Sequence, residues 1–112
     1  MSNYKFFIFL SLILLATSPA FAEETQSVSL FTSGQNHFVK NQFSLALKDW
    51  QKAAEQGDVK AMNKLAEMYV KGAGVAVDNE KALKYWHQAA DKSDGDAMYE
   101  IAISYETARG VP

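Results

Sequence analysis

Apolar residues recur at three- and four-residue steps through most of the chain after residue 28, and polar residues fill the positions between them. This spacing places the apolar side chains along one face of an α-helix. The pattern predicts helices at about residues 29–41, 44–56, 59–70 and 95–107, and one more that begins after Asp78 and contains Ala82 to Ala90. Strands are not expected between them. The sequence therefore indicates an all-α fold.

The apolar pattern repeats itself at an offset of thirty-six residues. The matched pairs are Trp50 and Trp86, Ala53 and Ala89, Ala54 and Ala90, Ala61 and Ala97, Met62 and Met98, Leu65 and Ile101, Ala66 and Ala102, Tyr69 and Tyr105, and Gly74 and Gly110. So many matches at one offset indicate one structural unit that is copied and stacked. Gly34 precedes Ala66 by thirty-two residues and is interpreted as part of a degenerate first copy.

The connections between the predicted helices are short and carry turn residues. Asp58, Asp78 and Asp94 each stand just before a helix, where a carboxylate accepts a hydrogen bond from a free backbone N–H group. The glycines expected to supply positive backbone angles after a helix are Gly57, Gly72 and Gly74. Turns this short make neighbouring helices antiparallel. We expect Val75, from the loop 72–79, to pack between successive helix pairs.

Trp50 and Trp86 are assigned to the core, because each lies at the centre of an apolar stripe. Small alanines on the same stripes let helix backbones approach closely, and larger residues there would overpack the contact. Tyr85 and His87 are expected on the outer face of their helix.

The first part of the chain has the features of a secretory signal. Residues 1–22 contain Lys5, a short apolar run, and a small-residue pattern that ends at Ala22, so we predict cleavage before Glu23. An uncleaved anchor is the alternative, although the apolar run is short for a membrane span. We expect residues 23–28 to be a flexible segment and 29–112 to form the repeat domain, in a periplasmic or secreted protein.

The run from Ala61 to Ala90 resembles the Sel-one-like repeat, a relative of the tetratricopeptide repeat. The residues that carry the resemblance are Leu65, Tyr69, Gly72, Ala73, Gly74, Val75, Asp78, Lys81, Ala82, Tyr85, Trp86, Ala89 and Ala90. The resemblance implies an α/α superhelix, or solenoid, of about two antiparallel helix pairs plus an unpaired C-terminal helix. The sequence departs from the pattern where the glycine loop is missing before Ser44, and where Gly57 and Gly72 return as Ser93 and Ala108.

Proteins of this family generally act as adaptors, so the resemblance implies a protein–protein interaction module. It would hold a protein or peptide in a concave groove that is lined by the first helix of each pair. By the same resemblance, the candidate partner-binding residues are Lys60, Asn63, Glu67, Asp96, Tyr99 and Ile103. Each of them also suits an ordinary solvated helix face, and Tyr99 equally suits packing against a neighbouring helix.

The C-terminal helix lacks a mate and is expected to present an open apolar edge made of Ile101, Tyr105 and Val111. This edge is a docking surface, a homodimer contact, or the place where a longer array continues.

Composition and charge favour binding over catalysis. After the predicted cleavage the chain carries 10 Lys and Arg against 13 Asp and Glu, without the basic stripe of a nucleic-acid-binding protein. We expect no membrane contact beyond export. With two histidines and no cysteine, neither a metal site nor a cofactor is expected. No catalytic residues are assigned, since Thr32-Ser33-Gly34 does not match a hydrolase nucleophile turn. The alternative is a β-lactamase-like hydrolytic enzyme of the cell envelope.

Overall fold

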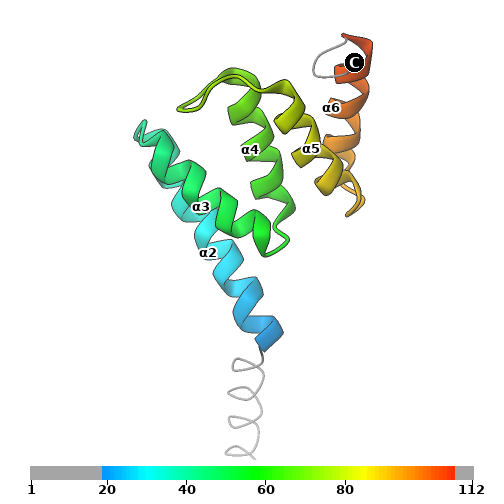
Figure 1. The fold of residues 1–112 in the computed structure, drawn as a ribbon. Coiled ribbons are helices and arrows are strands. Elements are labelled where there is room, and N and C mark those ends of the chain that lie inside the picture. Colours follow the sequence, from blue (N-terminus) through cyan, green and yellow to red (C-terminus); the bar gives the residue numbers. More distant parts are fainter. Residues whose placement is uncertain (1–18, 108–112) are drawn as a thin grey trace, which may run out of the picture.

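The computed structural model describes residues 19–107, which contain five α-helices and no strand (Figure 1). The helices are α2 (Pro19–Val39), α3 (Phe43–Glu55), α4 (Val59–Lys71), α5 (Asn79–Ala90) and α6 (Gly95–Glu106). The prediction of an all-α fold is confirmed. None of these helices combines the length and the apolar character needed to cross a membrane.

The helices form two antiparallel pairs and a single last helix. The most extensive contacts join α2 to α3 and α4 to α5, while α3 meets α4 and α5 meets α6 less extensively. Figure 1 shows the pairs side by side, with α6 at the end of the array. This arrangement is the expected α/α solenoid of two pairs plus an unpaired C-terminal helix.

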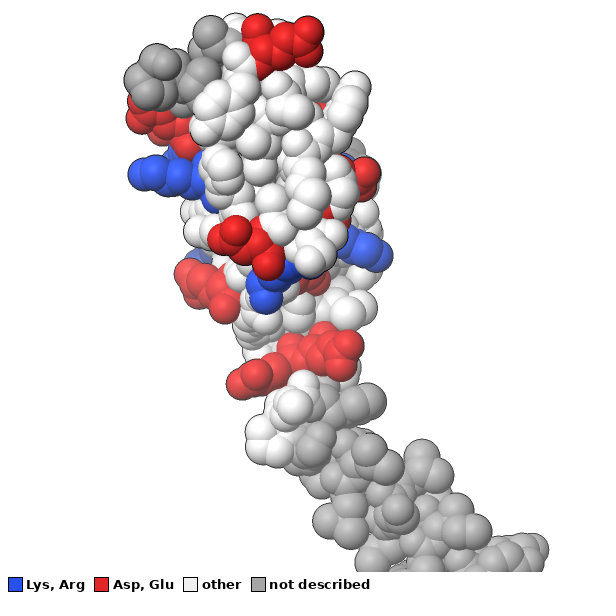
Figure 2. Space-filling model, turned by 90° about the vertical axis from the view of Figure 1, so that its right-hand side faces the viewer, with Lys and Arg blue, Asp and Glu red and all other residues white. Residues whose placement is uncertain are grey.

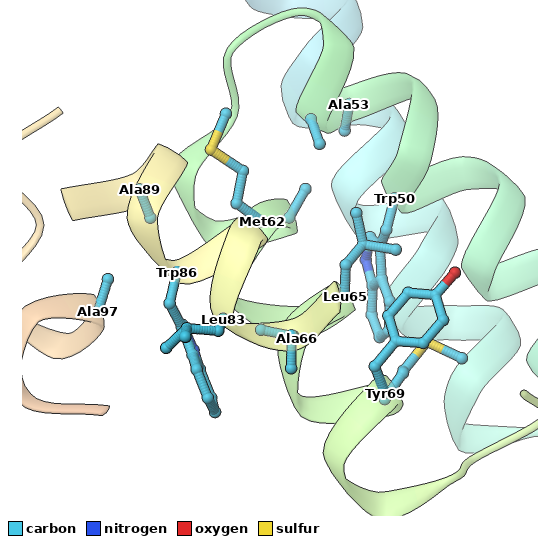
Figure 3. Close-up of a cluster of buried hydrophobic side chains, with 14 of the residues drawn as sticks. Trp50, Ala53, Met62, Leu65, Ala66, Tyr69, Leu83, Trp86, Ala89 and Ala97 are labelled. Atoms are coloured by element: carbon cyan, nitrogen blue, oxygen red, sulfur yellow. The ribbon is translucent and has the colours of Figure 1, made fainter. Parts of the chain in front are cut away.

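One hydrophobic seam runs through the array. Trp50 and Trp86 are 1% and 3% exposed, so their assignment to the core is confirmed. Trp50 and Leu65 contribute to the packing between α3 and α4, and Ala97 extends the seam to α6 (Figure 3). Val75 packs against this core from the loop, as expected, whereas Val77 is exposed.

The predicted turn chemistry is present in the connections that follow α3, α4 and α5. The N-cap side chains of Asp58, Asp78 and Asp94 each accept a hydrogen bond from a backbone N–H three residues ahead. Positive φ angles occur at the predicted glycines, Gly57, Gly72 and Gly74. Ser93 occupies the place of Gly57 in the second copy and keeps its left-handed backbone, at φ 65°. A side chain in this region is unfavourable, so the second copy retains the turn at a conformational cost.

The first helix differs from the prediction. It begins at Pro19, so residues 23–28 are helical where a flexible segment was expected. The interactions of Ser27 explain the difference: it is buried, and its hydroxyl donates to Asp58 Oδ2 at 2.9 Å. Tertiary contact therefore orders a stretch that lacks apolar periodicity. Most of the predicted signal peptide, residues 1–18, lies outside the described part.

Two predicted positions on later helices need correction. Tyr85 does not lie on an outer face: its ring stacks on Tyr69, with centroids 6.1 Å apart, and burial raises its pKa. Lys81 lies 5.0 Å from the centroid of the Tyr69 ring, so a cation adds to the stack. Met98 was expected on the inner stripe of α6 but is 49% exposed. No helix covers that side of α6 within residues 19–107.

Gly34 allows α2 to approach α3 at the Trp50 indole. A Cβ atom built on Gly34 would overlap the indole ring, and the indole N–H donates to the carbonyl of Phe31, 3.1 Å away. Glycine normally weakens a helix interior by about 1 kcal/mol relative to alanine. Here its lack of a side chain makes room for the largest core residue.

We predict that Gly34→Ala destabilises the protein by about 1–3 kcal/mol, since overpacking outweighs the gain in helix propensity. Urea unfolding followed by circular dichroism measures the change. Gly95→Ala is the matched control, because nothing lies within 4 Å of a Cβ built there. It should raise stability by about 0.5 kcal/mol. Equal effects of the two substitutions would contradict this account of α2–α3 packing.

Candidate protein-binding groove

The first helices of successive repeats are α2, α4 and α6. Hollows lie between them, on both sides of α4. The α2–α4 hollow has a volume of about 530 Å³. It is lined by Gln35, Asn36, Phe38, Val39, Trp50, Lys64, Glu67, Met68, Lys71 and Ala73. The α4–α6 hollow has a volume of about 350 Å³. It is lined by Asn63, Glu67, Trp86, Asp96, Tyr99 and Glu100.

The two hollows form one groove along α4. Glu67 lines both of them, and a further hollow of about 320 Å³ beside Trp86 shares Lys71 with the first and Glu100 with the second. Concave surfaces with an apolar base and a few polar groups are where proteins usually bind ligands. We call this surface, from α2 across α4 to α6, the groove.

The spacing between the first helices is set by hydrogen bonds to the capping aspartates. Ser27 on α2 donates to Asp58 Oδ2, and Asn63 on α4 donates through Nδ2 to Asp94 Oδ2, both at 2.9 Å. Each pair is thirty-one residues apart. Each aspartate also caps its own helix, α4 or α6. One carboxylate thus starts a helix and attaches it to the preceding repeat.

The structure brings four of the six candidate partner-binding residues together. Asn63, Glu67, Asp96 and Tyr99 all line the α4–α6 hollow, and Tyr99 is 65% exposed. Asn63 also has the structural bond just described, and its Oδ1 atom is buried without a hydrogen-bond partner among the described residues.

The other two candidates lie elsewhere. Lys60 lines a separate hollow of about 490 Å³, between the beginnings of α2 and α4. Ile103 is half-buried on α6 and lines neither part of the groove. The groove therefore follows a face of the first helices that is centred slightly away from the predicted one.

Sequence reasoning missed several groove residues. Lys64 and Glu100 are thirty-six residues apart and occupy equivalent positions on α4 and α6. Lys71 continues the same face of α4, one helical turn beyond Glu67. The thirty-six-residue repeat marks Lys64 and Glu100 as equivalent positions. In the sequence alone, however, both look like ordinary solvated residues, because the neighbouring helix that completes the groove is not apparent.

The open edge lies at the far end of the array. Ile101 is half-buried and Tyr105 is 58% exposed, while Val111 lies outside the described residues. Figure 2 shows the molecule from the α6 side, where a largely uncharged surface is flanked by acidic and basic side chains. Exposed Met98 adds to the apolar character of this helix.

A Ser, Asp and His cluster joins α2 to α3, but its geometry is structural. Ser33 donates its hydroxyl hydrogen to Asp49 Oδ2 at 2.6 Å, and His37 Nδ1 lies 2.9 Å from the same oxygen. In a hydrolytic triad the serine must bond the imidazole, which removes its proton. Here the serine bonds the carboxylate instead. In residues 19–107, no three or more His, Asp and Glu side chains are grouped to hold a metal ion.

Comparisons with known proteins agree with this architecture. A model of the Sel1 repeat matches residues 31–58 and 59–94, which together make up more than half of the chain. A solved Sel1 repeat protein from Oxalobacter formigenes is similar in structure, with a TM-score of 0.70 and 30% sequence identity. The likeness covers 82% of this chain and 38% of that one, so this chain spans well under half of its length. No curated protein matches significantly.

We predict that Asp94→Ala costs more stability than Asp78→Ala. Asp78 only caps α5, and losing such a cap costs about 1 kcal/mol. Asp94 also holds Asn63, so its loss should cost about 2–3 kcal/mol. Thermal or urea unfolding measures both values.

A double-mutant cycle isolates the bond between the two first helices. Asn63→Ala, Asp94→Ala and the double variant should give a coupling of about 0.5–1.5 kcal/mol. Additive losses at the two positions would show that the bond contributes nothing to the attachment of α6.

Proposed function

Since the chain belongs to the Sel1 repeat family, we propose that it is an exported binding module that holds a segment of a partner protein in its groove. Sel1 repeats generally mediate protein–protein interactions. For this chain, the proposal adds two specific points: the groove is the binding surface, and the protein is located in the periplasm or outside the cell. The export signal predicted for residues 1–22 supports the location.

The observation that carries the proposal is the apolar base of the α2–α4 hollow. Phe38, Trp50 and Met68 line it together with polar side chains, which include two lysines. Trp50 and Met68 are almost fully buried, so the base is held rigidly by the core. A rigid aromatic base with a polar rim suits an apolar side chain of a bound segment, because little ordering is needed on binding.

The hydrolytic alternative receives no comparable support. The Ser33 hydroxyl is bonded to Asp49 and not to His37, and neither comparison points to an enzyme. Binding therefore remains the function that the geometry favours.

We expect a library of random twelve-residue peptides, displayed on phage and selected against the purified protein, to yield sequences that bind the groove. Their synthetic forms should lose at least about tenfold in affinity when Glu67 and Tyr99 are replaced by Ala, because few interface residues dominate binding energy. Fluorescence anisotropy measures the affinity.

The control is Lys84→Ala, at an exposed position of α5 that lines none of the hollows described above. It should leave affinity unchanged. If selection yields no binder, or the binders respond to Lys84→Ala as strongly as to the groove variants, the groove is not the binding surface.

We also propose that the open edge on α6 pairs with a second copy of the chain. Tyr105 is exposed and Ile101 is half-buried, on a helix that has no mate within residues 19–107. Pairing two such edges removes apolar surface from water on both sides, and twofold symmetry makes the contact self-complementary.

Light scattering after size-exclusion chromatography should show a dimer whose fraction rises with protein concentration. Tyr105→Glu should shift the population to monomer, because it places a charge in the contact. Leu45→Glu makes the same kind of change at an exposed position on α3 and should leave the dimer intact. A monomer at every concentration would refute the pairing.

A further inference from the structure

The two parts of the groove differ in charge. The α2–α4 hollow carries Lys64 and Lys71 against Glu67, whereas the α4–α6 hollow carries three carboxylates, on Glu67, Asp96 and Glu100, and no basic side chain. Helix α6 itself contains no Lys or Arg. The negative charge is thus concentrated where α4 faces α6.

Two of these carboxylates have no counter-ion within residues 19–107. Lys64 pairs with Glu67 at 3.2 Å, and the only other ion pair within residues 19–107 joins His37 to Asp49. Asp96 and Glu100 are therefore unpaired among the described residues. A bound segment with apolar groups at this place would remove water from the two carboxylates without replacing its hydrogen bonds. A segment with acidic groups would repel them, so both kinds of segment are unfavourable.

Aromatic and polar groups complete the α4–α6 hollow. Trp86, only 3% exposed, belongs to the core and contributes to the lining, while the exposed ring of Tyr99 stands between Asp96 and Glu100 in sequence. Carboxylates and an aromatic ring together suit an organic cation, which gains from charge pairing and from contact with the ring. A metal ion is a poorer fit, because these carboxylates do not converge on one point.

We infer that the α4–α6 hollow recognises a cationic side chain, arginine or lysine, in the segment that the groove binds. This inference rests on the proposed function and adds the chemistry of the partner to it. Charge complementarity supports the inference. Asp96 and Glu100, which have no ion-pair partner within residues 19–107, would contact the cation, and Tyr99 would pack beside it. The α2–α4 hollow, with its lysines and apolar base, does not share this preference.

The probe is the peptide acetyl-Ala-Arg-Ala-amide, and its matched control contains citrulline, which has the shape of arginine without the charge. Titration into the ¹⁵N-labelled protein is followed by NMR. The arginine peptide should shift the signals of Tyr99, the Asn63 side-chain amide and the Trp86 indole. The citrulline peptide should bind at least about fivefold more weakly. Added salt should weaken the binding of the arginine peptide but not that of the citrulline peptide.

Asp96→Asn combined with Glu100→Gln keeps shape and removes charge, and it should reduce arginine-peptide affinity to that of citrulline. Glu106→Gln, on the same helix outside the hollow, removes charge elsewhere and should change little. Circular dichroism establishes that each variant is folded. Equal binding of the two peptides, or an equal loss with Glu106→Gln, would overturn the inference.

The same set of variants separates this inference from the proposed function. If the phage-selected peptides bind the groove without a basic residue and ignore the Asp96 and Glu100 changes, the cation preference is wrong and groove binding stands. If those peptides carry Arg or Lys and lose affinity with the Asp96 and Glu100 changes as well as with the Glu67 and Tyr99 changes, both are supported. If no peptide binds the groove, both fall together.

Discussion

The array depends on aspartates that each perform two structural tasks. Asp58 and Asp94 cap α4 and α6, and each also accepts a hydrogen bond from the first helix of the preceding repeat. A hydrogen bond to a charged acceptor in a half-buried place is stronger than one between neutral groups. Because the aspartate belongs to the turn, the bond fixes where the next helix begins relative to the previous one. The apolar seam holds the helices together, and these bonds set their register and hence the shape of the groove.

Much of the fold could be predicted because its signals are local. A glycine followed by an aspartate ends one helix and starts the next, and the thirty-six-residue offset of the tryptophans identifies the repeat. The bond between Asn63 and Asp94 has no local signal, since it joins side chains thirty-one residues apart. The same holds for Ser27, which orders the start of α2, and for Tyr85, whose burial is decided by Tyr69 on another helix. The candidate partner-binding residues lie on α4 and α6, and which of them share one hollow depends on how those helices meet.

The departures from the repeat show which constraints are strict. The connection between α2 and α3 is short, and within these helices Gly34 lets the Trp50 indole come closer than a side chain would allow. In the second copy Ser93 adopts the backbone of Gly57 despite its Cβ atom. Turn geometry is therefore kept even where the residue is unfavourable. Exposed positions on the first helices are not restricted by turn geometry or close packing. The residue types at these positions therefore differ from one repeat to the next.

Equivalent positions on the three first helices illustrate this freedom. Ser27, Asn63 and Tyr99 follow one another at intervals of thirty-six residues. The first two bond to the capping aspartate of the next repeat, whereas Tyr99 bonds to no described side chain and is 65% exposed. A position that joins two repeats thus becomes a surface position where the described array ends. Its side chain lines the α4–α6 hollow with Asp96 and Glu100, so the position that joins two repeats on α2 and α4 contributes on α6 to the acidic part of the groove.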